Sequence, residues 1–361
     1  MKKIDRVRCL TYHLIFKFKR SLGTLLECRN VKLLITGAFG NIGKAVITEA
    51  SNRGHEVIVF EIENKKTRKT ARKLRRKIQK VVFGDIRNIE SVKQAIQECE
   101  AIIHLAAIIP PTSKKHRNLT MAVNYDGTKN LVQAIEETKR EIPFVFTSSA
   151  SVMGPTQLQE KIVERNDSLI ITGNYEESKI KCEEFLKENA DNYLIFRLAG
   201  VLPMLSPIST GYMEEVFDMH LDSRMEMILD LDVATALVTG AEKLASGTTQ
   251  KNQAYILGGG KSNGLQFKAN EFLSTLFGSF SLPLPDRKYF TPDINTFHLD
   301  WYDTAEAQKE FQYQNHSMEE YIKHLKKTYG VFKLPIILFR KIIMKKLVEK
   351  SPYYEKNKEI N

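Results

Sequence analysis

Short apolar runs alternate with amphipathic segments along the first 200 residues of the chain. The apolar runs have the length and the β-branched content of buried strands: 31–35, 56–60, 81–83, 101–105, 144–147 and 193–198. The segments between them space their apolar residues as helices do: 45–54, 65–80, 89–97, 119–139 and 175–189. Strands that alternate with helices form a parallel sheet with helices on both faces. The pattern therefore predicts an α/β fold, a Rossmann-type doubly wound parallel sheet.

The alternation becomes less regular after residue 200, which predicts a smaller C-terminal lobe. A late strand at 255–257 runs into three glycines, and helices are predicted at 271–277 and 318–329. A further short helix is expected to begin at Trp301. Asp232, directly before an apolar helical pattern, is interpreted as a helix N-cap.

A glycine-rich turn follows the first predicted strand and directly precedes a helix. Strand, glycine turn and helix form the context of a dinucleotide-binding fingerprint, in which the glycines allow a tight turn and close approach of a pyrophosphate. The pyrophosphate then lies on the free N–H groups of the helix start. Alone, the glycines fit an ordinary strand–helix turn equally well. The residues of this loop that we expect to bind a cofactor are Gly37, Phe39, Gly40, Asn41, Ile42 and Gly43.

Glu61 ends the second predicted strand, about 20 residues beyond the glycines. An acidic side chain there accepts hydrogen bonds from the adenosine ribose and repels a 2′-phosphate, so it favours NAD over NADP. Ten Lys/Arg and no acidic residue follow within 65–80, on a helix whose basic face is expected to be solvated. A basic side chain from that helix would instead suit NADP, which stays the alternative.

Tyr175 and Lys179 lie four residues apart at the start of a predicted helix, and therefore on one helical face. A phenol has a pKa of about 10, which makes it a poor base at neutral pH. A neighbouring ammonium stabilises the phenolate and lowers that pKa. The pair suits proton transfer at a substrate oxygen while a hydride moves.

Together, in this order, these features resemble the extended short-chain dehydrogenase/reductase family, which includes the nucleotide-sugar epimerases and dehydratases. The glycine spacing Gly-x-x-Gly-x-x-Gly after Thr36, the acidic strand end, a Ser-bearing strand end at 148–149 and the Tyr-x-x-x-Lys helix carry the resemblance. It covers about 31–330, strongly to residue 200 and loosely after it. The segment 124–131 is similar to the family's Asn-x-x-Gly-Thr-x-Asn-Leu helix.

The resemblance implies roles for individual residues. Ser149 would hydrogen-bond the reacting oxygen of the substrate, Tyr175 and Lys179 would be catalytic, and Asn124 would be a structural and proton-relay residue. Lys179 would also hold the nicotinamide ribose. The remaining expected cofactor contacts are Asp85 and Ile86 at the adenine and Leu105, Ala106 and Ala107 near the nicotinamide. His104 is interpreted as a core or strand-end histidine rather than a catalyst.

Three departures from the family pattern bear on the reaction. Met153 stands where Tyr is frequent, no Asp-Glu pair follows the Ser position, and 197–203 lacks the Asn with which UDP-sugar epimerases bind the diphosphate. The missing acid pair disfavours a dehydratase. A nucleotide-sugar epimerase is the first hypothesis, a net dehydrogenase or reductase of a non-sugar alcohol or ketone the alternative, and a non-catalytic cofactor sensor the third. Arg224 is either a ligand for a substrate anion or a surface arginine.

The resemblance and the pattern suggest four parts: a basic extension at 1–30, an NAD-binding domain at 31–200, a substrate lobe interleaved with it at 201–330, and a basic amphipathic tail at 331–361. Residues 1–30 fit either a basic arm or a segment upstream of a native start at Val31. In the tail, Ile336, Phe339 and Ile343 share a face with basic residues between them. Such a helix, over 334–350, suits a membrane surface or a partner groove, or docking on the protein's own body.

The net charge of +11 belongs to the two ends of the chain, since 1–30 carries +6 and 333–361 carries +5. The body is neutral, so we expect a small-molecule substrate and no nucleic-acid partner. Four scattered cysteines without Cys-x-x-Cys spacing predict neither disulfides nor a metal site and suit a reducing, cytoplasmic location, with the tail at the inner membrane surface as one option. The family resemblance further implies a homodimer.

Overall fold

The computed structural model describes residues 30–159, 161–205 and 216–355. The chain separates into two units, 1–30 and 31–361, and every helix and strand of the described residues belongs to the second. The predicted N-terminal extension therefore lies outside the described residues, apart from Asn30.

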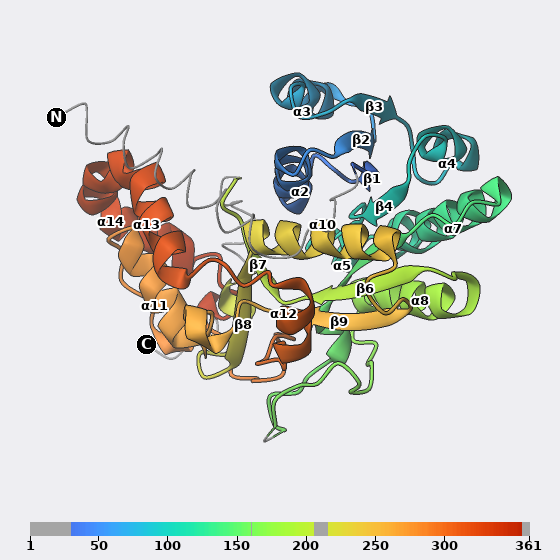
Figure 1. Ribbon diagram of the computed structural model, residues 1–361. Coiled ribbons are helices and arrows are strands. Elements are labelled where there is room, and N and C mark those ends of the chain that lie inside the picture. Colours follow the sequence, from blue (N-terminus) through green and yellow to red (C-terminus); the bar gives the residue numbers. More distant parts are fainter. Residues whose placement is uncertain (1–29, 160, 206–215, 356–361) are drawn as a thin grey trace. The chain divides into compact units, whose positions relative to one another are not determined.

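A seven-stranded sheet forms the centre of this unit (Figure 1). Its strands lie in the order β3-β2-β1-β4-β5-β6-β9, and every neighbouring pair is parallel. The strands span β1 Lys32–Thr36, β2 Glu56–Glu61, β3 Lys80–Phe83, β4 Ala101–His104, β5 Phe144–Ser149, β6 Tyr193–Leu198 and β9 Gln253–Leu257. The order reverses between β1 and β4, so the predicted doubly wound parallel sheet is confirmed.

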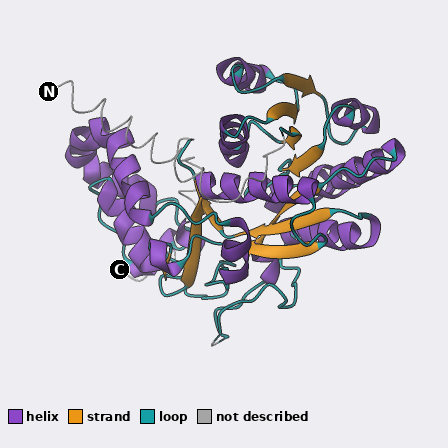
Figure 2. Cartoon of the chain, viewed as in Figure 1, coloured by secondary structure: helices purple, strands orange, loops and turns teal. Residues whose placement is uncertain are grey.

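Helices cover both faces of the sheet, as Figure 2 shows in purple around the orange strands. They span α2 Asn41–Asn52, α3 Lys65–Leu74, α4 Ile89–Ile96, α5 Thr112–Lys115, α6 Arg117–Thr120, α7 Gly127–Thr138, α8 Asn174–Asn189, α10 Asp230–Ser246 and α12 Ala305–Phe311. The π-helix η1, Met121–Asp126, joins α6 to α7. Helices α2, α10 and α12 pack on one face, and α4, α7 and α8 on the other.

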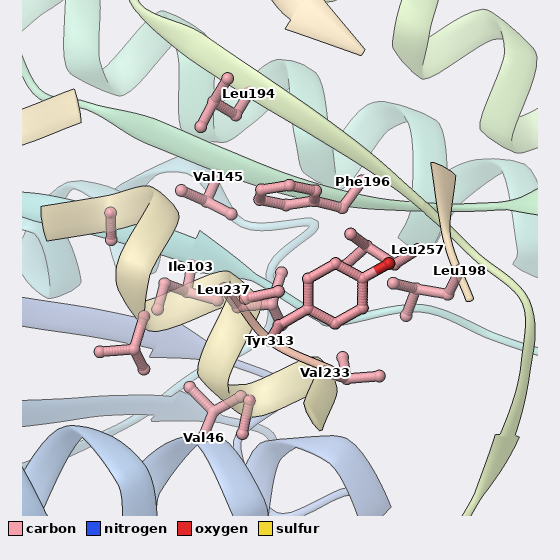
Figure 3. Packing of buried hydrophobic residues seen from close by; sticks show 14 of the residues in the cluster. Val46, Ile103, Val145, Leu194, Phe196, Leu198, Val233, Leu237, Leu257 and Tyr313 are labelled. Carbon is pink, nitrogen blue, oxygen red and sulfur yellow. The ribbon is translucent and has the colours of Figure 1, made fainter. Parts of the chain in front are cut away.

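The strand alternation explains why two apolar cores form. Leu33 and Ile35 of β1 point to the core shared with α2 and α10, whereas Leu34 between them points to the core shared with α4 and α7. Figure 3 shows the first of these cores, in which Phe196 of β6 lies near Leu237 of α10 and Tyr313. Because a parallel sheet is buried on both sides, its strands read as continuous apolar runs in the sequence.

A smaller lobe follows in the sequence and has its own three-stranded sheet, in the order β10-β8-β7. Its elements are β7 Gly200–Leu202, β8 Arg224–Leu229, β10 Gln266–Lys268, α11 Ala269–Ser279, α13 Met318–Tyr329 and α14 Lys333–Val348. Short 3₁₀ turns η3 to η6 lie at 216–218, 261–263, 287–289 and 330–332, whereas η2, at 150–153, directly follows β5 of the large sheet. A third apolar cluster holds these elements together. The division of the chain into a cofactor domain and a substrate lobe stays a prediction.

Several local predictions were wrong. The helix expected over 119–139 is interrupted by η1, and the helix expected to run to residue 80 ends at Leu74. Asp232 is not an N-cap: α10 begins at Asp230, and the Asp232 carboxylate instead lies 2.5 Å from Nδ1 of His316. The helix expected at Trp301 begins at Ala305, since Tyr302 forms a bridge with Val163. No helix in the described part of the chain is long and apolar enough to cross a membrane.

Candidate active site

Two side chains, Thr36 and His104, join the carboxyl ends of β1 and β4, the neighbouring strands at which the strand order reverses. The Thr36 hydroxyl at the end of β1 accepts the N–H groups of Leu105 and Ala106 after β4, each at 3.2 Å. Its oxygen also lies 2.6 Å from Nδ1 of His104. Ligands of doubly wound sheets bind in the crevice beyond such a reversal of strand order. The threonine therefore fixes the backbone that borders the expected nicotinamide position.

His104 is fully buried, and both of its ring nitrogens have partners. The Thr128 hydroxyl donates to the carbonyl of Asn124 at 2.6 Å, so it accepts from Nε2 of His104 at 2.9 Å. Nδ1 then accepts from Thr36. Burial and, to a smaller extent, the nearby Lys179 charge together lower the pKa of His104 to about 3, so the ring is neutral. This residue connects β4 to β1 and α7, which agrees with its interpretation as a core histidine.

The glycine turn has no room for side chains at two of its positions. A Cβ on Gly37 would lie 2.7 Å from the backbone N and Cα of Ala106, and one on Gly43 would lie 2.4 Å from the carbonyl oxygen of Ala38. Gly40 is the N-cap of α2 and provides no capping side chain, so the first N–H groups of this helix are available to an anion. The turn thus fits the pyrophosphate of a dinucleotide.

We expect Gly37→Ala to abolish dinucleotide binding and to lower the free energy of unfolding by more than the matched change Gly247→Ala. The two glycines have nearly equal φ values of 63° and 65°, but a Cβ on Gly247 would meet nothing within 4 Å. The control therefore measures backbone strain alone, on the order of 1–3 kcal/mol. Urea unfolding and titration calorimetry with NAD measure both effects. Equal losses in the two variants would contradict the proposed clash with Ala106.

Glu61 lies at the end of β2 and contacts the glycine turn. Its carboxylate accepts the N–H of Phe39 at 3.1 Å and that of Ile62 at 3.1 Å, while burial raises its pKa. This position is the one expected for a carboxylate that binds ribose hydroxyls. On the other side of β2, Asp85 is paired with Arg87, whose hydrogen bond lowers the pKa of that carboxyl group. Ile86 beside it is buried.

Lys44 on α2 lies close enough to the basic helix α3 to be affected by its charges. Burial lowers its pKa, and the charges of Lys66 and Lys73 on α3 lower it further. Part of the predicted basic surface therefore faces α2 near the cofactor turn. A 2′-phosphate of NADP would find basic side chains here, whereas the Glu61 carboxylate favours NAD.

Lys179 is buried on α8, one turn after Tyr175. Its Nζ donates to the carbonyl oxygen of Thr147 in β5 at 2.7 Å and lies 5.9 Å from the centre of the Tyr175 ring. Burial lowers the pKa of Lys179 to about 8, although Cys182 and Glu183 oppose this change. The predicted Tyr–Lys pair is thus on one helical face, with the ammonium fixed to the strand that ends in Ser149.

Ser149 ends β5 and begins a 3₁₀ turn, Ala150–Met153. Its hydroxyl oxygen accepts the N–H of Ser151 at 3.2 Å and lies 2.9 Å from the Ser151 hydroxyl. The neighbouring Ser148 hydroxyl is buried and has no partner in the described residues. Both Ser149 and Tyr175 are half-buried, the exposure that a group touching a substrate needs.

Asn124 holds the loop after β4 against α8. Its side-chain oxygen accepts the N–H of Ile108 at 2.7 Å, and its amide donates to the Ile108 carbonyl at 3.1 Å and to the Ser178 hydroxyl at 2.9 Å. Ser178 in turn donates to the carbonyl oxygen of Tyr175 at 2.7 Å. In the wide turn of η1, the backbone carbonyl of Asn124 accepts a hydrogen bond from the Thr128 hydroxyl. π-turns of this kind occur often at functional sites.

Sequence reasoning missed the connecting residues. Ser178 and Thr147 join the expected catalytic groups to one another, and Thr36 joins the two halves of the cofactor crevice. Ser178 stands beside Lys179 in the motif, and Thr36 directly precedes Gly37. Their types and positions are thus visible in the sequence, but their partners come from distant elements.

Arg224 forms a two-point ion pair with Asp300, in which Nε and Nη2 lie 2.6 and 2.9 Å from the carboxylate oxygens. Its Nη2 also donates to the carbonyl of Gln159 at 2.9 Å. The arginine therefore joins β8 to two loops. Its predicted role as a ligand for a substrate anion stays a prediction.

We expect Lys179→Met to inactivate the protein without lowering its stability at pH 7. The native pKa of about 8 lies below the ordinary value of 10.5, so burial of the ammonium costs on the order of 3 kcal/mol below pH 8. That cost fades between about pH 8 and pH 10.5, where the unfolded chain binds more protons and the wild type gains stability. Urea unfolding of both proteins across this range measures the difference. A large loss of stability at pH 7 would show that the bond to Thr147 outweighs burial.

Several known proteins are similar to this chain in sequence. Residues 34–196 match the 3-beta hydroxysteroid dehydrogenase/isomerase family. A 3-beta-hydroxysteroid dehydrogenase from Mycolicibacterium neoaurum is 29% identical over 251 residues, which are 64% of this chain and 66% of that protein. A UDP-N-acetyl-alpha-D-glucosaminuronate decarboxylase from Bacillus cytotoxicus is 28% identical over 130 residues, 36% of this chain and 40% of that protein. The chain thus spans just under two thirds of the first relative and well under half of the second.

The fold is also similar to a solved structure. A UDP-glucose-4-epimerase from Stenotrophomonas maltophila, crystallised with NAD and formylated UDP-arabinopyranose, superposes with a TM-score of 0.68. The match covers 83% of this chain and 97% of that chain at 20% identity. At this identity the likeness shows a shared fold.

Proposed function

We propose that the chain is an NAD-dependent enzyme of the extended short-chain dehydrogenase/reductase family that transfers a hydride at a secondary alcohol or ketone. The observation that carries the proposal is the fixed pair of Tyr175 and Lys179 beside the strand end that bears Ser149. The glycine turn, the open start of α2 and the Glu61 carboxylate fit the dinucleotide that such a reaction needs.

The bound dinucleotide supplies the hydride acceptor or donor, and the residues of the chain position the substrate and move its proton. In the oxidation direction, Ser149 donates a hydrogen bond to the substrate oxygen and Tyr175 takes the hydroxyl proton as the hydride leaves the carbon. The Lys179 ammonium favours the phenolate form of Tyr175. Asn124 and Ser178 hold the first turn of α8, and therefore the tyrosine, against the loop after β4.

For the substrate, we propose an apolar alcohol or ketone. Exposed isoleucines lie on both segments that border Tyr175: Ile109 is 47% exposed, Ile170 40% and Ile171 58%. The loop of Ile109 reaches the start of α8, since Asn174 donates to the carbonyl of Ser113 at 3.0 Å. A diphosphate needs donors at such a rim, whereas apolar side chains suit an apolar molecule. The family match and the Mycolicibacterium relative support the same substrate class.

A nucleotide-sugar epimerase is the second candidate, since the decarboxylase relative and the superposed epimerase act on nucleotide sugars. In that case the hydride returns to the sugar within each cycle. The missing Asn in 197–203 and the pairing of Arg224 with Asp300 weaken this candidate, because both positions would face a diphosphate. The homodimer and the cytoplasmic location stay predictions.

The test is to supply the purified protein with NAD or NADP and either a 3β-hydroxysteroid or UDP-glucose. We expect reduced cofactor to accumulate with the steroid, a larger rise in melting temperature with NAD than with NADP, and no turnover of the sugar nucleotide. Formation of an epimeric sugar nucleotide without net reduction would establish the second candidate. A protein that binds neither dinucleotide would contradict both.

A further inference from the structure

The segment 330–342 concentrates the exposed apolar surface of the chain. In the described residues, seven of the fifteen large apolar side chains that are exposed lie within these positions, and their exposed fractions run from 40% to 79%. They are Val331, Phe332, Leu334, Ile337, Leu338, Phe339 and Ile342. Isolated apolar residues on a surface need no explanation, but a continuous group of this kind marks an interaction site.

Helix α14 is fixed to the lobe by its other side. Leu347 is buried in the third apolar cluster, and Met344 packs against that cluster. Just after the helix, the Ser351 hydroxyl donates to the carbonyl oxygen of Tyr289 at 2.6 Å, and Tyr354 stacks on the Tyr289 ring. The sequence left open whether this helix packs on the protein itself or exposes an apolar face for a membrane or partner. In the structure one face of the helix packs on the lobe and the opposite face is exposed.

The outward face combines apolar and basic side chains. Leu334, Leu338 and Ile342 recur every four residues and therefore share one face of the helix. Lys341 and Lys345 lie at the same angular position, toward its C-terminal half. The helix has no acidic residue between Lys333 and Val348. In the part of the chain that the structure describes, no carboxylate pairs with its exposed basic side chains, Lys333, Arg340, Lys341, Lys345 and Lys346.

We propose that α14 docks on the surface of a lipid membrane that contains anionic lipids, with Leu334, Leu338 and Ile342 inserted between the headgroups. Apolar residues on one face with lysines among them are the features of helices that lie in the membrane interface. The unpaired positive charges complement anionic headgroups. A second copy of the chain fits less well, because this helix carries basic and no acidic side chains, so two copies of the same face would repel each other. The proposal does not depend on the proposed function.

The test is flotation of the full chain with vesicles of phosphatidylcholine alone and of phosphatidylcholine with phosphatidylserine. We expect the protein to float with the anionic vesicles and to remain unbound with the neutral ones. Lys341→Gln with Lys345→Gln is expected to weaken partition about thirtyfold, since each lysine near an anionic surface contributes about fivefold. Leu334→Ser with Leu338→Ser is expected to abolish flotation.

Two controls distinguish membrane binding through α14 from nonspecific binding of a basic protein and from loss of the fold. Lys69→Gln with Arg72→Gln removes the same charge from α3, in which no large apolar side chain is exposed, and is expected to leave flotation unchanged. Thermal unfolding of every variant checks that the fold is intact. Absence of flotation by the wild type, or equal loss in the α3 variant, would overturn the proposal. So would light scattering that shows a dimer in the wild type and a monomer in the leucine variant, because the occupant would then be a second copy.

Discussion

Replacing Tyr175 by phenylalanine is expected to lower turnover by about 10²–10⁴-fold, the contribution of one positioned general acid or base. The phenol is the group that exchanges a proton with the substrate oxygen, while the ring itself packs beside Lys179 at 5.9 Å. Phenylalanine keeps the ring and removes the hydroxyl. Dinucleotide binding should therefore be retained, and the loss should appear in kcat. Initial rates with the steroid substrate and titration calorimetry with NAD measure the two quantities separately.

The matched control is Tyr125→Phe. Tyr125 lies on η1, is half-buried and packs edge-on against Phe185 of α8, so the substitution changes a tyrosine close to the site without touching the proposed chemistry. We expect its turnover to equal that of the wild type. If Tyr175→Phe kept full activity, the proton would be moved by another group and the proposed mechanism would be wrong.

The sheet was predictable because its physical cause is local in the sequence. Each central strand is buried on both faces, so Leu33, Leu34 and Ile35 read as an unbroken apolar run that periodicity detects. The interruption of the helix at η1 was not predictable in the same way. It depends on Asn124 reaching Ile108 and Ser178, and neither partner is near it in the chain.

In the candidate site, too, features fixed by local sequence were predictable, whereas contacts between distant elements were not. Motif spacing places Gly37, Tyr175 and Lys179 correctly relative to their own elements, since a turn or a helix face fixes those positions. The bond from Lys179 to the Thr147 carbonyl and the pairing of Arg224 with Asp300 depend on how separate elements pack. Spacing in the sequence carries no information about such contacts, which is why a role for Arg224 remained open.

The buried ion pair between Glu183 and Arg197 is expected to produce the largest stability effect in the chain. Glu183 lies on α8 one turn beyond Lys179, and Arg197 lies on β6. Nη2 and Nε of the arginine lie 2.7 and 3.0 Å from the two carboxylate oxygens, and both residues are almost inaccessible to water. Removing one partner of such a pair leaves an uncompensated buried charge, which costs about 3–5 kcal/mol.

We therefore expect Glu183→Leu to lower the free energy of unfolding by about 3–5 kcal/mol in urea titrations. Arg197→Met combined with Glu183→Leu should recover much of that loss, because no charge is then left without a partner. The recovery is expected to be incomplete, since Nη1 of Arg197 also donates to the carbonyl of Arg165 at 2.7 Å. The matched control is Glu98→Leu, which breaks the exposed pair with Lys80 and should have no measurable effect.

Turnover in the same variants shows whether the ion pair also serves the site. Helix α8 carries Tyr175, Lys179 and Glu183 on successive turns, so a helix released from β6 is expected to misplace the catalytic pair. Without urea, where the Glu183→Leu protein is fully folded, we still expect its kcat to be lower than that of the wild type. In the double variant, we expect kcat to recover together with the free energy of unfolding. If the double variant were as unstable as the single one, the ion pair would hold α8 through shape rather than charge, and an uncompensated buried charge would not be the cause of the loss.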